Sequence, residues 1–455
     1  MSELGPLDSG FMEMEDADRH ISLGIGAIAI IAGPVPARQE FTAAMAGSLV
    51  SDSRLRQRVR RTVADLAAPV WEDDPNFDLA HHLRWTALPE PGDEAALREL
   101  VAAELEERLD RDHPLWQCIV VEHLAEDRWA LIIKAHHTMV DGASGIGLFE
   151  SFCDPVSSTS APRPTTGTRQ QINAFGLAAQ SLRLSMAMPR MAFDMTRALI
   201  PVVYAAVTPT GTSSFNGPIG RQRRYAVARA SLADIAEIRA AFGVTVNDVA
   251  LATVASAYRT VLHKRGEEPT ADKIRILVPV SMRHEDAKYV LDNRVSAMLP
   301  YLPVEISDPV ERLTAVHQRI AQHRSRGEAE AEKSVLSMAG RLPFAFVAWT
   351  LRLAMHYPQH GVSALATNVP GPRQKLSLQG REVLEILPCI PIAMRLRTTI
   401  AILSYTDQLT FGITGDYDTT PDIDLIADEI EHGITELLDR ARERNQKTTL
   451  GDRPS

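Results

Sequence analysis

The sequence predicts an α/β protein with two lobes. Strand-like and helix-like segments alternate in both halves of the 455-residue chain, and a long stretch of different composition separates the halves. The length agrees with two lobes, since domains of ~150 residues are typical and a chain of this length would contain two or three of them. We expect a first lobe at 1–153, a crossover at 154–218 and a second lobe at 219–455.

The first lobe should alternate buried strands with amphipathic helices. The apolar run at 24–31 is typical of a buried strand, and 37–49 repeats apolar residues at helical spacing. Asp93 can cap a further helix. Two strands are then expected at 115–124 and 128–135, and the second leads directly into a pair of histidines.

The crossover has two kinds of composition. Residues 154–170 are rich in Pro, Ser, Thr and Gly, as linkers are, and 171–207 has a helical pattern. Its Met-rich part at 185–207 is interpreted first as packing between the lobes. The alternative is an adaptable apolar surface for acyl chains or a membrane.

The second lobe also mixes both kinds of element. Thr245 and Asp248 fit a capping box at the start of an apolar helix, and a final helix is expected from 421 to about 440. Five apolar runs predict strands at 274–280, 295–302, 362–367, 396–404 and 409–414. Binding sites often lie between lobes, so the interface between the two is where a site is expected.

Composition and charge exclude several classes of protein. The net charge of −10 argues against general nucleic-acid binding, which depends on cation contacts to phosphate. Three widely spaced cysteines exclude a disulfide framework and a cysteine-based zinc site, and no other metal motif is present, so no metal is expected. There is no signal-peptide pattern and no apolar run of the roughly 18 residues that span a membrane. We therefore expect a cytoplasmic protein.

The sharpest cluster of chemically active residues is His136, His137, Asp141 and Gly142, spaced H-H-x-x-x-D-G. Adjacent residues of a strand point to opposite faces, so the two histidines cannot converge on one metal ion or substrate. One should face a cavity and the other should pack within its lobe. The alternative is purely structural, with two core histidines and an aspartate that caps a helix at 142–152.

This motif resembles the active-site motif of the CoA-dependent acyltransferase superfamily. Other motifs narrow the resemblance to the bacterial wax ester synthase/diacylglycerol acyltransferase family, and triacylglycerol synthases of mycobacterial type are the most similar. The shared motifs cover nearly the whole chain: L-D-S-G-F at 7–11, P-L-W at 114–116, T-V-N-D at 245–248, P-V-S-M-R at 279–283, D-N-R-V-S at 292–296, T-N-V-P-G-P at 367–372 and S-Y at 404–405.

The resemblance implies a fold and an activity. The fold would be two chloramphenicol-acetyltransferase-like lobes with a channel between them, joined by a long helical crossover. The activity would be acyl transfer from acyl-CoA, a co-substrate, to diacylglycerol, with long-chain alcohols as a second acceptor class and no cofactor. Such an enzyme is expected at the surface of the inner membrane or of lipid droplets. The alternatives are a non-catalytic lipid-binding or droplet-coating protein and a related condensing or hydrolytic enzyme.

The resemblance also assigns roles within the motif. His137 would be the general base, a task that suits an imidazole because its ordinary pKa lies near neutrality. His136 and Asp141 would support the motif, and Gly142 would permit its turn. Asp141 would pair with an arginine.

Further candidates lie elsewhere in the chain. Arg283 and Arg294 are the two candidate partners for the aspartate, and a bidentate arginine–carboxylate pair would suit that purpose. Acyl transfer also needs a hydrogen-bond donor that stabilises the tetrahedral oxyanion. Asn368, Ser404 and the backbone amides beside them are candidates for that donor and for substrate binding.

Overall fold

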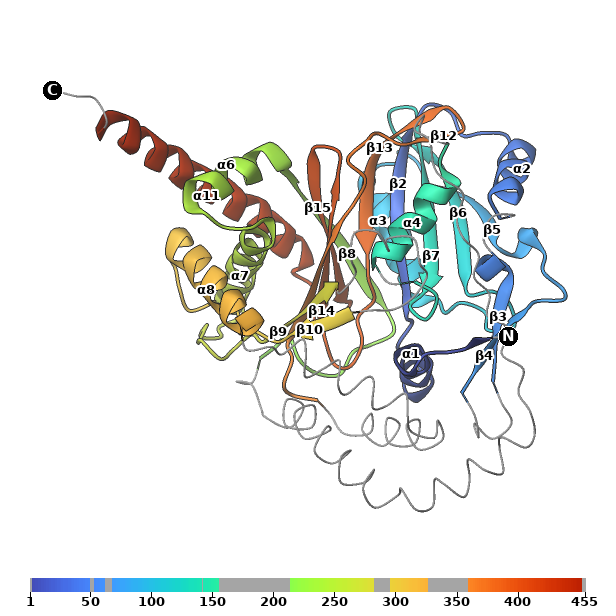
Figure 1. The fold of residues 1–455 in the computed structure, drawn as a ribbon, viewed down its shortest axis with the longest axis horizontal. Helices are drawn as coiled ribbons and strands as arrows, with labels where there is room; N and C mark the ends of the chain where they lie inside the picture. The colour runs from blue at the N-terminus through green and yellow to red at the C-terminus, as the bar shows by residue number, and fades with distance from the viewer. Residues whose placement is uncertain are drawn as a thin grey trace, which may run out of the picture.

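Two six-stranded sheets form the centres of two lobes that lie side by side (Figure 1). The computed structural model describes residues 2–49, 53–61, 68–140, 142–154, 213–281, 295–325 and 359–451. The crossover expected at 154–218, with its Met-rich segment, falls almost entirely outside the described residues. Within the described ranges no single helix is long and apolar enough to span a bilayer. The helices α6 (Leu232–Phe242) and α7 (Val246–Lys264) reach that length and composition together, as a pair bent by 99°.

The sheet of the first lobe has the strand order β12-β13-β2-β7-β6-β5. Its strands are β2 (Gly24–Ala32), β5 (Leu83–Ala87), β6 (Trp116–Leu124), β7 (Arg128–His136), β12 (Ser377–Leu378) and β13 (Arg381–Cys389). Its helices are α1 (Pro6–Ala17), α2 (Arg38–Leu49), α3 (Glu94–Glu106) and α4 (Gly142–Phe152), with short 3-10 helices at Ser53–Arg56 and Leu79–His81. A small three-stranded sheet joins β1 (Ser2–Glu3), β4 (Val70–Asp73) and β3 (Gln57–Arg60).

Local sequence patterns explain the elements of this lobe. The expected strands at 24–31, 115–124 and 128–135 are confirmed as β2, β6 and β7, and the helix at 37–49 is confirmed as α2. The Asp93 carboxylate accepts a hydrogen bond from the N–H of Ala96 at 2.9 Å and so caps α3. The apolar face of α3 is buried, through Leu97, Val101 and Leu105.

The sheet of the second lobe has the order β10-β9-β11-β14-β15-β8. Its strands are β8 (Arg223–Ser231), β9 (Ile276–Ser281), β10 (Val295–Met298), β11 (Ala364–Pro370), β14 (Thr398–Tyr405) and β15 (Gln408–Asp416). Its helices are α6 (Leu232–Phe242), α7 (Val246–Lys264), α8 (Pro309–Ser325) and α11 (Ile423–Gly451). The five strands expected in this half are confirmed, with their ends shifted by up to four residues.

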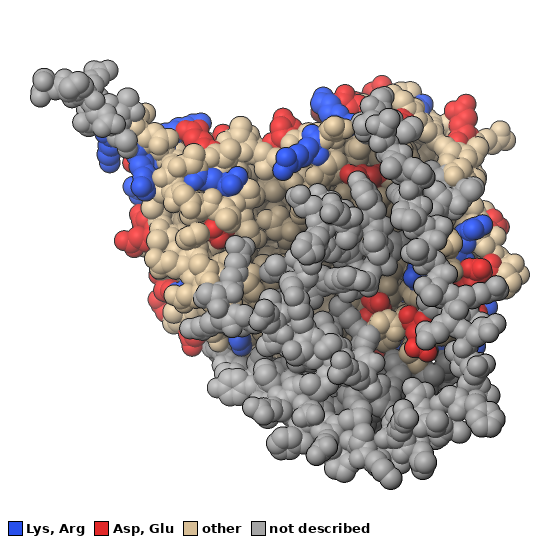
Figure 2. Space-filling model, in the orientation of Figure 1, with Lys and Arg blue, Asp and Glu red and all other residues tan. Residues whose placement is uncertain are grey.

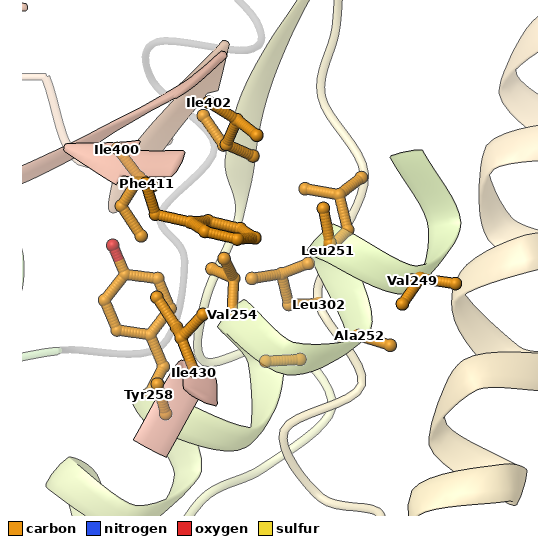
Figure 3. Close-up of a cluster of buried hydrophobic side chains, with 14 of the residues drawn as sticks. Val249, Leu251, Ala252, Val254, Tyr258, Leu302, Ile400, Ile402, Phe411 and Ile430 are labelled. Atoms are coloured by element: carbon orange, nitrogen blue, oxygen red, sulfur yellow. The ribbon is translucent and has the colours of Figure 1, made fainter. Parts of the chain in front are cut away.

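Helices α7 and α11 pack on this sheet and close the core of the second lobe. Figure 3 shows Phe411 of β15 lying against Val254 of α7, with Tyr258 of the same helix close by. The expected capping box is confirmed, because Thr245 Oγ1 accepts from the N–H of Asp248 at 3.2 Å while Asp248 Oδ2 accepts from the N–H of Thr245 at 2.9 Å.

The expected end of the last helix near residue 440 is wrong. Helix α11 continues to Gly451, and Figure 1 shows its last turns extending beyond the lobe. Its last buried residue in the described side chains is Ala441, after which strong helix formers such as Arg442 and Glu443 continue it. Leu450 is the one large apolar residue of the sequence 442–451, so hydrophobic periodicity could not mark this extension.

The two lobes share a strand. In the chain, β13 belongs to the second half, yet it pairs antiparallel with β2 of the first lobe, with Cys389 opposite Gly26. At its end β13 also meets the other sheet, since the Tyr225 hydroxyl donates to the carbonyl of Pro388 at 2.8 Å. A Cβ on Gly412 of β15 would lie 1.7 Å from that carbonyl oxygen, so the close approach requires glycine there.

Candidate active site

The histidine motif lies at the end of β7, which is held on both sides. The backbone N–H of His136 donates to the carbonyl of Leu115 at 2.9 Å, and that of His137 donates to the carbonyl of Leu23 at 3.0 Å. The N–H of Met139 then donates to the carbonyl of His136 at 2.8 Å, closing a turn before α4 begins at Gly142. The motif is therefore anchored by backbone bonds to both neighbouring segments.

The rings of His136 and His137 differ in burial and in their neighbours. His136 is only 1% exposed, and its Nδ1 accepts a hydrogen bond from the N–H of Thr138 at 3.1 Å. Nδ1 also lies 2.9 Å from Thr138 Oγ1, a contact in which its role depends on the tautomer. With Nδ1 as the acceptor, the neutral ring carries its proton on Nε2, which lies 3.6 Å from Oε2 of Glu15. His137 is half-buried, and its ring stacks on Phe11 of α1 with centroids 4.2 Å apart.

Glu15 is a buried carboxylate that sequence reasoning missed. Its Oε1 accepts from the N–H of Leu23 at 2.9 Å, and its Oε2 accepts from Arg111 at 2.6 Å. Burial by itself raises the pKa of Glu15, but His136, Arg111 and the Leu23 N–H together outweigh burial and lower the pKa to about 2. The available signal was the four-residue spacing of Phe11 and Glu15, which places both on one helical face.

Lys134, two residues before the histidines, has a structural role. Its ammonium is buried and donates to the carbonyls of Glu104 and Glu107 at the C-terminal end of α3. Burial lowers the pKa of this lysine, and nearby acidic groups oppose that shift. The lysine thus satisfies helix-end carbonyls that would otherwise lack partners, and it ties α3 to β7.

An apolar cavity of about 70 Å³ lies between the two lobes beside the motif. The first lobe supplies residues of β2, β7 and α4, including Ala135 just before the histidine pair, and Val140 from the turn between β7 and α4. The second half supplies residues of β11, β13 and β14, including Val369, Cys389 and Leu403. Its described lining carries no charged side chain, so the cavity suits a hydrocarbon chain rather than a polar group.

The two substrate-binding candidates lie near this cavity but point elsewhere. Asn368 Nδ2 donates to Asn247 Oδ1 at 3.5 Å, at the start of α7. Its strand neighbours Thr367 and Val369 line the cavity, so alternation places Asn368 on the opposite face of β11. Ser404 Oγ accepts from a backbone N–H instead, that of Gly371, at 3.2 Å. The roles of Asn368 and Ser404 in catalysis stay predictions.

The remaining motif residues cannot be placed side by side. Asp141 and both candidate arginines, Arg283 and Arg294, lie outside the described residues, so their pairing stays a prediction. Gly142 begins α4. In the part of the chain that the structure describes, no group of three or more His, Cys, Asp or Glu residues could hold a metal ion.

A two-lobed α/β fold of this kind is found in a solved wax ester synthase/diacylglycerol acyltransferase and in solved condensation domains. Solved structures share this fold. The wax ester synthase/diacylglycerol acyltransferase of Marinobacter aquaeolei matches with a TM-score of 0.68 and 25% identity over 97% of this chain and 100% of that chain. A starter condensation domain of rhizomide synthetase, in complex with C8-CoA, matches in fold at 14% identity with a TM-score of 0.59, over 96% of this chain and 94% of that chain.

Sequence comparison identifies the family. The model of the wax ester synthase/diacylglycerol acyltransferase catalytic domain matches residues 4–250, and that of the WS/DGAT C-terminal domain matches residues 291–438. The chain belongs to this family. It is 42% identical over 450 residues to "Probable diacyglycerol O-acyltransferase tgs1" of Mycobacterium tuberculosis, covering 98% of this chain and 97% of the relative. It is 26% identical to "O-acyltransferase WSD" of Acinetobacter baylyi, covering 95% of this chain and 96% of the relative.

Proposed function

We propose that this chain transfers a long-chain acyl group from acyl-CoA to the free hydroxyl of diacylglycerol, producing triacylglycerol, with long-chain alcohols as a second class of acceptor. The observation that carries the proposal is that the histidine motif directly follows a strand whose residues Ile133 and Ala135 line an apolar cavity between the lobes. The acceptor is taken from the relative that is 42% identical along nearly the whole chain and bears the name diacylglycerol O-acyltransferase.

In this proposal His137 acts as a general base. The acceptor hydroxyl gives its proton to the imidazole as its oxygen attacks the thioester carbonyl, forming a tetrahedral oxyanion. The oxyanion then collapses, the carbon–sulfur bond breaks, and the imidazolium returns the proton to the sulfur of CoA. No covalent enzyme intermediate is needed, because both substrates meet at one ring. Asn368 and Ser404 remain the candidate donors to the oxyanion.

The apolar cavity is proposed to take the hydrocarbon chain of a substrate. Each buried CH₂ contributes roughly 0.8 kcal/mol, so a long chain supplies binding energy that a short chain cannot. Ala135 and Val140 line the cavity and flank the two histidines in the sequence, which supports this proposal. Both diacylglycerol and its product partition into membranes. We therefore also propose that the protein is cytoplasmic and binds the surface of the inner membrane or of lipid droplets.

The test is incubation of the purified protein with radiolabelled palmitoyl-CoA and either diacylglycerol or hexadecanol, followed by lipid separation. Labelled triacylglycerol with the first acceptor supports the proposal, and wax ester with the second adds the second acceptor class. Labelled free fatty acid alone would instead identify a hydrolytic enzyme. Lipid binding without any product would identify a non-catalytic lipid-binding protein.

A further inference from the structure

Helix α1 presents one face to both motif histidines. Phe11 and Glu15 are four residues apart, so they lie one above the other on the helix. The ring of Phe11 stacks on the ring of His137, with centroids 4.2 Å apart and planes 21° from parallel. Oε2 of Glu15 lies 3.6 Å from Nε2 of His136. One turn of α1 thus lies beside both rings.

Glu15 also reaches His137 through the backbone. Its Oε1 accepts from the N–H of Leu23, and the carbonyl of Leu23 accepts from the N–H of His137 at 3.0 Å. Leu23 is buried, at 3% exposure, so this relay is shielded from water. Each oxygen of the Glu15 carboxylate is therefore linked to one histidine. Oε2 lies beside the ring nitrogen of His136, and Oε1 is linked to the backbone of His137 through Leu23.

The Glu15 carboxylate is held in one position and is ionised at neutral pH. The Glu15 side chain is 1% exposed and is held by Arg111 at 2.6 Å. Because the pKa of this carboxyl is lowered to about 2, it is ionised at neutral pH. Arg108 holds the segment after α1, donating to the carbonyls of Glu15, Asp18 and Ile21 at 2.5, 2.7 and 2.9 Å. The position of the carboxylate relative to the histidines is thereby determined.

We propose that Glu15 is a positioning residue of the acyl transfer reaction. Its negative charge keeps the His136 ring with the proton on Nε2, and its bond to Leu23 sets the backbone from which His137 presents its imidazole. The inference rests on the proposed function, in which His137 is the base. Glu15 touches neither substrate, so it acts on the rate only through the placement of that base.

The alternative is that Glu15 only stabilises the fold, since breaking any buried ion pair lowers the stability of a protein. The chain offers a matched control on the same helix. Glu13 is 2% exposed and pairs with Arg61 at 3.0 Å. Glu13→Gln therefore removes an equally buried, arginine-paired carboxylate from α1. The described contacts of Glu13 do not include either motif histidine.

The first experiment compares Glu15→Gln with Glu13→Gln in the full chain, measuring kcat, KM for palmitoyl-CoA and the melting temperature. A small displacement of a catalytic group can cost up to about 100-fold in rate, so we expect Glu15→Gln to lower kcat by roughly 10- to 100-fold with KM changed by less than about threefold. Glu13→Gln should leave kcat of the folded protein within about twofold. Glu15→Asp keeps the charge and should retain more kcat than Glu15→Gln.

Equal kcat in the two glutamine variants would overturn the proposal, as would a loss confined to KM. The second experiment does not depend on activity or on a variant that folds. Nitrogen NMR of the parent should show His136 with the proton on Nε2, and a ring protonated on Nδ1 instead would also overturn the proposal. If the parent protein has the His136 proton on Nε2 but forms no ester, the proposed acyltransferase function is wrong. The inference that Glu15 positions the His136 ring would still be supported.

Discussion

The ring of Phe11 stacks on the imidazole of His137, with centroids 4.2 Å apart and planes 21° from parallel. This contact joins the first helix of the chain to the end of β7 and restricts the rotation of the proposed base. It also matters after proton transfer, because a positive ring is attracted by the face of an aromatic neighbour. The first helix therefore contributes to the proposed active site.

Replacement of Phe11 by Leu should lower kcat more than it lowers stability. An aromatic pair contributes roughly 0.5–1.5 kcal/mol, so loss of the stack should reduce kcat by about two- to tenfold. Phe77→Leu is the matched control, since Phe77 stacks on His82, a histidine outside the motif, with centroids 5.3 Å apart. Steady-state kinetics and thermal melting of both variants check this. Equal kcat in the two would show that the stack has no part in turnover.

Elements built from local patterns could be predicted from the sequence. An apolar run predicts β7, whose end at His136 places the motif at a strand terminus. The spacing of Thr245 and Asp248 likewise predicts the start of α7, because a capping box needs only neighbouring residues. In both cases the stabilising contacts are short in sequence, so the pattern contains the necessary information.

The parts that depend on distant contacts could not be predicted. Strand β13 contains Pro388 and alternates weakly, and it is stabilised by β2, from the other end of the chain. Likewise, nothing near Glu15 in sequence indicates that Arg111 and His136 surround it. The direction of Asn368, toward Asn247 rather than into the cavity, depends on how α7 packs on β11. Such features follow from tertiary packing.

Acid should destabilise the protein partly through Glu15. A carboxyl whose pKa is lowered from 4.5 to about 2 binds fewer protons in the folded chain than in the unfolded chain. Its stabilising contribution is therefore complete above pH 4.5 and is lost as the pH falls toward 2. This contribution amounts to about 3 kcal/mol. Unfolding of the parent and of Glu15→Gln, followed from neutral to acidic pH, should converge in stability as the pH falls. Parallel pH profiles would contradict this.

Two glycines of the cavity wall should respond in opposite ways to alanine. A Cβ on Gly145 of α4 would meet only Val140, at an ordinary 4.0 Å, so Gly145→Ala should stabilise by about 0.5–1 kcal/mol, as alanine does in a helix. A Cβ on Gly26 would lie 2.8 Å from the carbonyl oxygen of Ile133 and 2.9 Å from Sγ of Cys389. Gly26→Ala should therefore destabilise by roughly 1–3 kcal/mol.

The same substitution at Gly145 tests where the hydrocarbon chain lies. The added methyl group occupies part of the cavity, so Gly145→Ala should shift preference toward acyl-CoA shorter by about one methylene. Competition between acyl-CoA substrates of different length, with parent and variant, measures this shift. A variant that melts higher but keeps the parent's chain-length preference would place the chain elsewhere.

Separate replacement of the two histidines tests the mechanism. If His137 is the only general base, His137→Ala should bind acyl-CoA nearly as well as the parent and lose turnover by about 10²–10⁴-fold, or roughly 3–5 kcal/mol of barrier. His136 is buried beside Glu15, with its Nδ1 bonded to Thr138, so His136→Ala should act mainly through folding. The fraction of the His136→Ala variant that remains folded should lose less activity than the His137→Ala variant does.

The two acceptors provide the internal control for this test. One imidazole serves either hydroxyl, so His137→Ala should reduce triacylglycerol and wax ester formation by the same factor. Circular dichroism and acyl-CoA binding confirm that the variant is folded. Turnover near that of the parent in folded His137→Ala would exclude His137 as the base. Loss of only one product would instead require a second base for the other alcohol. The candidates Asn368 and Ser404 cannot supply one, since neither an amide nor an unactivated hydroxyl accepts a proton at neutral pH.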